Sequence, residues 1–207
     1  LKAVMASSYT SGQIAAEAWV YLESYPENRA VILDRPGVSA RESEDRRSVG
    51  FSLSVGAKGA LTFDFANPRD GRCSRTTSDP EVVPVDAWAH VAVVQNQTRS
   101  LFVDGKRVKT ASVQRSDSFM AGSQQAENQP ASIFIGVNAE GQSGISGRID
   151  QVRIHSGVVK FWPRPKNDWT DPAARRAIPM GAPHFRTGSR PALYLRFDGN
   201  LLDAGTH

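Results

Sequence analysis

The chain has 207 residues, with 25 lysines and arginines against 21 aspartates and glutamates, and a formal net charge of +4. Its basic residues are scattered among acidic ones, whereas a nucleic-acid surface needs them clustered in a stripe, so we expect no nucleic-acid partner. No run approaches the roughly 20 apolar residues of a membrane span, so we expect no membrane insertion, and the single cysteine, Cys73, excludes a disulfide within the chain.

Short apolar or β-branched runs recur along the chain, and turn residues separate them. In chain order the expected strands are residues 13–22, 29–34, 49–56, 60–66, 89–95, 100–104, 106–113, 132–137, 146–155 and 192–199. Two turns predict two consecutive hairpins. The first is the polar break at Asn96-Gln97-Thr98, and the second is the pair Asp104-Gly105, which suits a type I′ turn. Only residues 171–178, with Asp171 as N-cap, suit a helical turn or two, so the pattern predicts an all-β antiparallel β-sandwich.

Residues 158–191 differ in texture from the expected strands, because they hold six prolines, two tryptophans and several arginines. Trp162, Trp169 and Phe185 supply apolar anchors that a free linker lacks, so we expect an ordered Pro/Arg-rich strap. The run at 192–199 alternates like a strand and should return to the same sandwich. We therefore expect one domain over residues 1–207, with its core at 13–156. The start at Leu1, without a charged and then an apolar region, indicates a segment of a longer protein.

Five pieces of sequence, in a fixed order, carry a family resemblance. They are Glu17-Ala18-Trp19-Val20, Trp88-x-His90-Val91-Ala92-Val93-Val94, Leu101-x-Val103-Asp104-Gly105-x-x-Val108, Ile135-Gly136 and Gly147-x-Ile149-Asp150-x-Val152-Arg153-Ile154. Together they resemble the laminin G-like domains of the concanavalin A-like lectin/glucanase superfamily over about residues 13–156. The resemblance implies a two-sheet jelly roll that acts as an extracellular carbohydrate- or protein-binding module of a larger protein. The strap at 158–191 departs from the family pattern.

Catalysis is not expected from this chain. The superfamily includes retaining glucanases, which need two carboxyl groups about 5 to 5.5 Å apart. The nearest match, Glu42-x-Glu44, lies in the charged run 41–47, which we interpret as a solvated loop. The four histidines lie near no Gly-x-Ser-x-Gly elbow, and their wide spacing also argues against zinc. We therefore expect a non-catalytic binding module.

Alternation along residues 15–22 places Glu17, Trp19 and Tyr21 on the face opposite the expected core. That face could stack a sugar ring, although a packing role is favoured for Trp19. We interpret His90 as a histidine at the edge of the core with one hydrogen-bonded nitrogen. Asp150 is expected to be a half-buried acceptor that holds a loop.

A structural calcium ion is the one cofactor that the sequence suggests. Asp198, Asn200 and Asp203 cluster at the end of the last expected strand, and calcium prefers such oxygen ligands. The resemblance points the same way, since many relatives of this fold carry a structural calcium. The same residues are also ordinary turn formers, and the plain turn is the favoured interpretation.

Binding is expected on loops, because strands supply rigidity and loops carry the contacts. The candidate contact residues are Tyr25, Arg35, Asn138, Trp162 and Trp169. The alternative for the two tryptophans is that they only pin the strap to the sandwich. A glycan is the favoured ligand; the alternative is a protein-interaction or structural module within a larger assembly. An extracellular or cell-surface location follows from the resemblance, with an intracellular assembly as the alternative.

Asn96-Gln97-Thr98 also forms a glycosylation sequon. Its place in an expected hairpin turn predicts that Asn96 is exposed and able to accept a glycan in a eukaryotic secretory pathway. The alternative is a bare turn.

Overall fold

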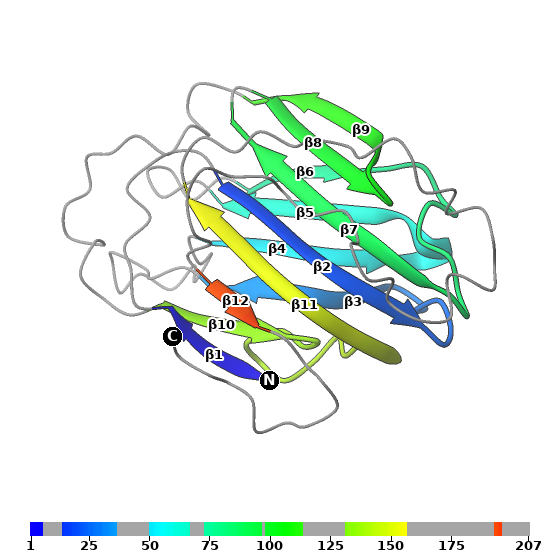
Figure 1. Ribbon diagram of the computed structural model, residues 1–207, viewed down its shortest axis with the longest axis horizontal. Helices are drawn as coiled ribbons and strands as arrows, with labels where there is room; N and C mark the ends of the chain where they lie inside the picture. The colour runs from blue at the N-terminus through cyan, green and yellow to red at the C-terminus, as the bar shows by residue number, and fades with distance from the viewer. Residues whose placement is uncertain are drawn as a thin grey trace.

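The protein is a sandwich of two β-sheets. The computed structural model describes residues 1–5, 14–36, 50–66, 73–96, 98–113, 131–156 and 193–195. Within these residues two antiparallel sheets of six strands each lie face to face as two layers (Figure 1). The predicted all-β, two-sheet antiparallel architecture is therefore confirmed. The described part of the chain holds no helix long and apolar enough to cross a membrane.

The first sheet lies behind in Figure 1 and has the strand order β1-β10-β3-β4-β5-β6. Its strands are β1 (Lys2–Met5), β3 (Arg29–Arg35), β4 (Phe51–Gly56), β5 (Leu61–Ala66), β6 (Cys73–Thr77) and β10 (Ala131–Ile135). A short 3-10 turn, η1 (Ala57–Gly59), connects β4 to β5. The two edges of this sheet are thus formed by β1 and β6.

The second sheet lies in front, and its strands run obliquely across those of the first (Figure 1). Its order is β12-β11-β2-β7-β8-β9. The bounds are β2 (Ile14–Leu22), β7 (Trp88–Gln95), β8 (Thr98–Val103), β9 (Lys106–Ser112), β11 (Gly147–Ser156) and β12 (Leu193–Leu195). Positive φ angles of 49° at Asp104 and 77° at Gly105 confirm the predicted tight turn between β8 and β9.

Most strands match their predicted ranges, with two additions. The strands β1 and β6 were not predicted, because four residues at a chain start and the polar segment Cys73–Thr77 lack a clear apolar alternation. Both are edge strands, which need only one neighbour and less apolar surface. The closing strand covers Leu193–Leu195 and pairs with β11. Several predicted parts of the chain lie outside the described residues. These are the charged run 41–47, the strap 158–191 with its expected helical turn, and residues 196–199.

The core lies between the two sheets and is built by alternation along each strand. In β2, Ala16, Ala18, Val20 and Leu22 all point into it, as predicted. A register shift in β3 between Val31 and Leu33 lets the adjacent residues Ile32 and Leu33 both enter the core. The inner faces are therefore mostly apolar, and the residues that alternate with them turn toward the outer faces.

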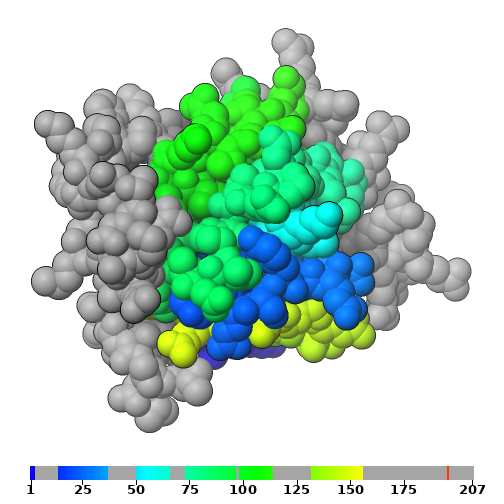
Figure 2. Space-filling model, turned by 90° about the vertical axis from the view of Figure 1, so that its right-hand side faces the viewer, coloured from blue at the N-terminus to red at the C-terminus, as the bar shows by residue number. Residues whose placement is uncertain are grey.

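One end of the sandwich is closed by turns from three parts of the chain. The turn after β2 lies between the segment that precedes β7 and the loop that follows β10 (Figure 2). Backbone hydrogen bonds fix this arrangement: Asp86 donates to the Leu22 carbonyl at 2.8 Å, and Glu23 donates to the Ser146 carbonyl at 3.0 Å. Val31 of β3 in the first sheet also donates to the Ser143 carbonyl at 2.8 Å, so backbone contacts tie this end to both sheets.

Candidate functional site

A row of polar side chains crosses the outer face of the first sheet. Ser52 lies between two core residues of β4, and Asp64 lies between two core phenylalanines of β5, so alternation turns both side chains outward. The strand register places Ser52 opposite Asp34 on one side and Asp64 on the other, and Asp64 opposite Arg75. Four strands thus contribute one neighbouring side chain each.

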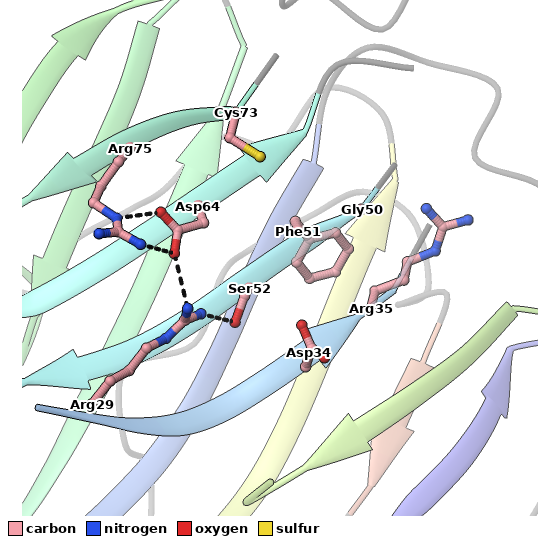
Figure 3. A pocket seen from close by; sticks show the side chains of 9 residues that line it. All are labelled: Arg29, Asp34, Arg35, Gly50, Phe51, Ser52, Asp64, Cys73 and Arg75. Carbon is pink, nitrogen blue, oxygen red and sulfur yellow. Dashed lines mark hydrogen bonds and ion pairs between the residues drawn. The ribbon is translucent and has the colours of Figure 1, made fainter. Parts of the chain in front are cut away.

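Two arginines hold Asp64 in this row (Figure 3). Arg75 donates from Nε to Oδ1 at 2.6 Å and from Nη2 to Oδ2 at 3.1 Å. Arg29 approaches from β3, with its Nη1 3.3 Å from Asp64 Oδ2 and its Nη2 donating to the Ser52 hydroxyl at 2.6 Å. The hydrogen bond and the charge of Asp64 raise the pKa of Arg75. The guanidinium groups are therefore held in place by paired contacts before any ligand arrives.

An open depression of about 250 Å³ lies over this row. It is lined by Arg29, Asp34, Arg35, Gly50, Phe51, Ser52, Asp64, Cys73 and Arg75, and Figure 3 shows these side chains together. Three arginines and two aspartates make the lining cationic when both carboxyl groups are ionised. The depression is the candidate binding site of the described residues.

Asp34 is a half-buried carboxyl group at this depression. Its Oδ2 accepts the backbone N–H of Ala139 at 3.1 Å, so the loop that follows β10 borders the site. Burial raises the pKa of Asp34, and it outweighs the lowering effects of the Ala139 hydrogen bond and of the charge of Arg29. Ionised Asp34 therefore costs free energy in this environment.

A second charged cluster lies on the outward side of the second sheet. Around Glu17, His90 Nε2 is 2.9 Å from Oε2, while Arg153 Nη1 and His155 Nε2 are 3.5 Å and 3.8 Å from Oε1. Burial by itself would raise the pKa of Glu17. Hydrogen bonds with His155 and His90 and the charges of His90 and Arg153 outweigh this effect and hold the pKa far below its usual range. Because Glu17 and both histidines are buried, we interpret the cluster as structural.

Arg35 is the predicted contact residue that the structure brings into the depression. Asn138 lies in the neighbouring loop, whose Ala139 contacts Asp34. The Asn138 side chain accepts the backbone N–H of Gln142 at 2.6 Å and so closes its own loop. Sequence reasoning therefore selected two residues that lie at or beside the site.

Tyr25 lies elsewhere, in the turn after β2. Its ring packs over Gly59, where an added Cβ would meet the ring at 2.7 Å, and it does not line the depression. The ring covers a glycine at this end of the sandwich, which is a packing contact. Trp162 and Trp169 lie outside the described residues, so their role as contacts or anchors stays a prediction.

The metal prediction also falls on residues beyond the described ranges, namely Asp198, Asn200 and Asp203. A structural calcium ion therefore stays a prediction. In the part of the chain that the structure describes, no group of three or more histidine, cysteine, aspartate or glutamate residues could hold a metal ion.

Several residues of the depression were not predicted, namely Arg29, Ser52, Asp64 and Arg75. Each lies within a strand, whereas contact residues were predicted in loops and carboxylate pairs were expected along a single strand. The available signal was a polar residue between two apolar ones, as in Phe51-Ser52-Leu53 or Phe63-Asp64-Phe65. That signal predicts an outward side chain but not its neighbours across strands.

Three further predictions on the second sheet can be compared with the structure. Trp19 is buried and lies against the His90 ring, with 5.4 Å between ring centroids, so its role is packing. His90 is buried and hydrogen-bonded through one ring nitrogen, as predicted. Asp150 is a half-buried acceptor as predicted, but it accepts the Gln151 N–H at 2.6 Å beside a register shift of β11 and so supports a bulge rather than a loop. Asn96 of the sequon is exposed.

The sandwich and its polar depression define a lectin-like fold class, and a family match agrees with it. The family model of the concanavalin A-like lectin/glucanases superfamily matches residues 3–160. The chain therefore belongs to this superfamily, and the resemblance to its laminin G-like domains is confirmed. No curated protein matches the chain.

Solved structures show the same fold at low sequence identity. The CBM40 of the Ruminococcus gnavus IT-sialidase, bound to alpha2,3 sialyllactose, is 14% identical with a TM-score of 0.56, over 75% of this chain and 79% of that one. A candidate carbohydrate-binding protein from Bacteroides ovatus is 19% identical with a TM-score of 0.57, over 96% of this chain and 49% of that one. Domains LG4-5 of the mouse laminin alpha1 chain are 17% identical with a TM-score of 0.51, over 74% and 37%.

Proposed function

We propose that the chain is a non-catalytic glycan-binding module of a longer extracellular protein, and that the glycan binds in the depression on the first sheet. The observation that carries the proposal is the row formed by Asp34, Ser52, Asp64 and Arg75, which neighbouring strands hold side by side. The extracellular location rests on the family resemblance.

This row suits a sugar for physical reasons. A sugar presents hydroxyl groups in fixed directions, and guanidinium, hydroxyl and carboxylate groups on rigid strands can meet them without large loss of side-chain entropy. The similarity to the CBM40 and to the Bacteroides ovatus protein supports the same ligand class.

The ion pairs of the site support a non-catalytic role. A retaining glycosidase needs one carboxyl group as nucleophile and a second as proton donor. Asp64 accepts two hydrogen bonds from Arg75 and forms an ion pair with Arg29 at 3.3 Å, so both of its carboxylate oxygens are already engaged. It is therefore poorly suited to either task beside Asp34. Glu42 and Glu44 lie outside the described residues.

A glycan array followed by calorimetry tests the proposal. The wild-type chain is expected to bind at least one glycan class, and Arg29→Gln should weaken that binding about tenfold, because one charge-assisted contact is lost. Arg148→Gln is the matched control, since Arg148 is exposed and stacks on Tyr21 of the second sheet at 5.6 Å.

Binding that is equally weakened by Arg29→Gln and Arg148→Gln would place the ligand elsewhere. A folded wild-type chain that binds no glycan would overturn the proposal and favour the protein-interaction alternative, which is then tested against the remainder of the full-length protein.

A further inference from the structure

We infer that the outer face of the second sheet is a docking surface, and that its occupant is the segment of this chain between β11 and β12, residues 157–192. The inference does not rest on the proposed glycan function, because the depression lies on the outer face of the first sheet. It rests on the burial of side chains that point away from the core, and on where this segment leaves and rejoins the second sheet.

Apolar side chains on this outer face are buried. Ala15, Ala92, Val94 and Phe102 form an apolar cluster that is separate from the core between the sheets. They alternate with core residues along β2, β7 and β8, so they point away from the first sheet. Each is nonetheless 7% exposed or less. Figure 1 shows this face toward the viewer, and none of the described strands lies in front of it.

Neighbours within the sheet account for only part of this burial. Arg107 of the adjacent strand lies over the Phe102 ring, 5.7 Å from its centroid. An antiparallel sheet face that meets water carries polar side chains, and its taller ones stay exposed. Here the rings of Trp19 and His155, which belong to the same face, are only 1% and 3% exposed. A further part of the chain therefore has to lie over them.

The burial is complete at one end of the face and partial at the other. Tyr21 and Trp88 are partners in the pairing of β2 with β7, and their side chains are only half-buried. Ala15 and Val94 are partners toward the other end of the same two strands, and both are buried. The cover therefore lies mainly over the end of the sheet where β2 begins and β7 ends.

Residues 157–192 leave and rejoin the second sheet at this same end. β11 ends at Ser156, opposite Ile14 at the start of β2, and β12 begins at Leu193, opposite Ile154. Two antiparallel neighbours can be joined by a loop of about two to five residues, so most of this segment is available to lie elsewhere. β8 is the third strand from β11, about 14 Å away, and a chain of this length spans that distance in both directions.

The other segments outside the described ranges are less well placed. Four of them start or end on the first sheet, namely 6–13, 37–49, 67–72 and 114–130. Residues 196–207 follow β12, whose last residue is opposite Val152 and so lies farther from the covered end. Only residues 157–192 have both attachments on the second sheet at that end.

The residue types of this segment suit the face. Its aromatic residues are Phe161, Trp162, Trp169 and Phe185. Small side chains such as Ala15 leave room above the sheet, which a large ring fills with apolar contacts. In this arrangement the two tryptophans anchor the segment, and the docked segment closes the face to a ligand.

Photo-cross-linking in the full chain identifies the occupant. Benzoylphenylalanine in place of Phe102 puts a photoreactive ring on the face, and mass spectrometry of the digested monomer locates the bond. We expect the bond within residues 157–192. The same probe in place of Tyr25, which is exposed at the opposite end of the sandwich, is the control and should give no bond to this segment. A bond from position 102 to another segment, or to a second copy of the chain, would overturn the inference.

Thiol labelling tests the same point without a bulky probe. In a Cys73→Ser background, the thiol introduced by Val94→Cys should react slowly with a maleimide. Replacing Trp162 and Trp169 together by alanine should speed this reaction about tenfold, because the cover opens more often. Phe119→Ala is the matched control, since Phe119 is the aromatic residue of segment 114–130, and it should leave the rate unchanged.

A thiol in the core separates opening of the cover from unfolding of the sandwich. Val20→Cys places it between the sheets, and it should stay protected in every variant. Equally fast labelling there would mean global unfolding, and the position of the cross-link then decides alone. An unchanged rate at position 94 after loss of both tryptophans, or a faster rate in Phe119→Ala, would show that residues 157–192 are not the cover.

Discussion

At the scale of single residues, the most unusual group in this protein is the buried carboxylate of Glu17. It lies in the middle of β2 and contacts His90 of β7 and Arg153 and His155 of β11. Removing a carboxylate from water is costly, and these partners compensate that cost. The cluster therefore connects the three central strands of the second sheet through one side chain.

Replacement of Glu17 by glutamine should destabilise the protein by about 3 kcal/mol, because Arg153 and the two buried histidines lose the carboxylate that they contact. The exposed Glu23, replaced in the same way, is the control and should change stability by less than about 0.5 kcal/mol. Urea unfolding of both variants measures the difference, and equal stabilities would contradict the structural role.

The same pair of variants has a defined pH dependence. The folded-state pKa of Glu17 lies below its unfolded value, so its contribution is present above the unfolded pKa of about 4.3 and is lost as the pH falls toward the folded pKa. The stability gap between wild type and Glu17→Gln should therefore be constant near neutral pH and shrink below about pH 4.

At the scale of elements, close backbone approach decides where β11 can begin. Gly147 is opposite Leu22 in the pairing of β11 with β2, and it has a φ of 150°. A Cβ at this position would collide with the carbonyl oxygen of Tyr21. The first residue of β11 must therefore lack a side chain.

Gly147→Ala should cost about 3 kcal/mol of stability, because the backbone of β2 or β11 has to shift. Gly141→Ala is the matched control: Gly141 also has a positive φ of 76°, but nothing lies within 4 Å of its added Cβ. It should cost only about 1 kcal/mol, from the φ angle alone. Chemical unfolding compares the two, and a reversed order would show that the approach of β11 to β2 is not tight.

At the scale of the whole molecule, Arg99 joins the two sheets near one side of the sandwich. It is buried in β8 of the second sheet, donates from Nε to Gln95 at 2.8 Å and contacts Ser74 and Thr76 of β6 in the first sheet. Its guanidinium carbon also lies 5.3 Å and 5.7 Å from the rings of Phe63 and Phe65 of β5. One side chain therefore links strands of both layers.

Arg99→Lys should lower stability by about 2 kcal/mol, because lysine keeps the charge but cannot reproduce the forked set of hydrogen bonds or the flat contact with the rings. Arg107→Lys, at an exposed position of the neighbouring strand β9, should have little effect. Thermal unfolding measures both, and a neutral Arg99→Lys would show that the charge alone holds the two sheets together here.

The sequence by itself was sufficient to predict most strands, their turns and the sandwich class. Alternation, β-branched residues and turn pairs such as Asp104-Gly105 are local features, so they can be read from neighbouring positions. The family resemblance and the outward direction of Asp64 and Ser52 follow from such local patterns as well. Arg35 and Asn138 were predicted as contact residues because they lie where strands end; the structure places them at or beside the depression, and their contact with a ligand stays a prediction.

The site and the charged cluster depended on tertiary structure. Arg29, Ser52, Asp64 and Arg75 come together only because β3, β4, β5 and β6 pair in one register, and a shift by one residue would turn them to the other face. Glu17 and His90 are 73 positions apart, yet pairing of β2 with β7 brings them within 2.9 Å. Such contacts are set by which strands become neighbours, and no local pattern in the chain encodes that choice.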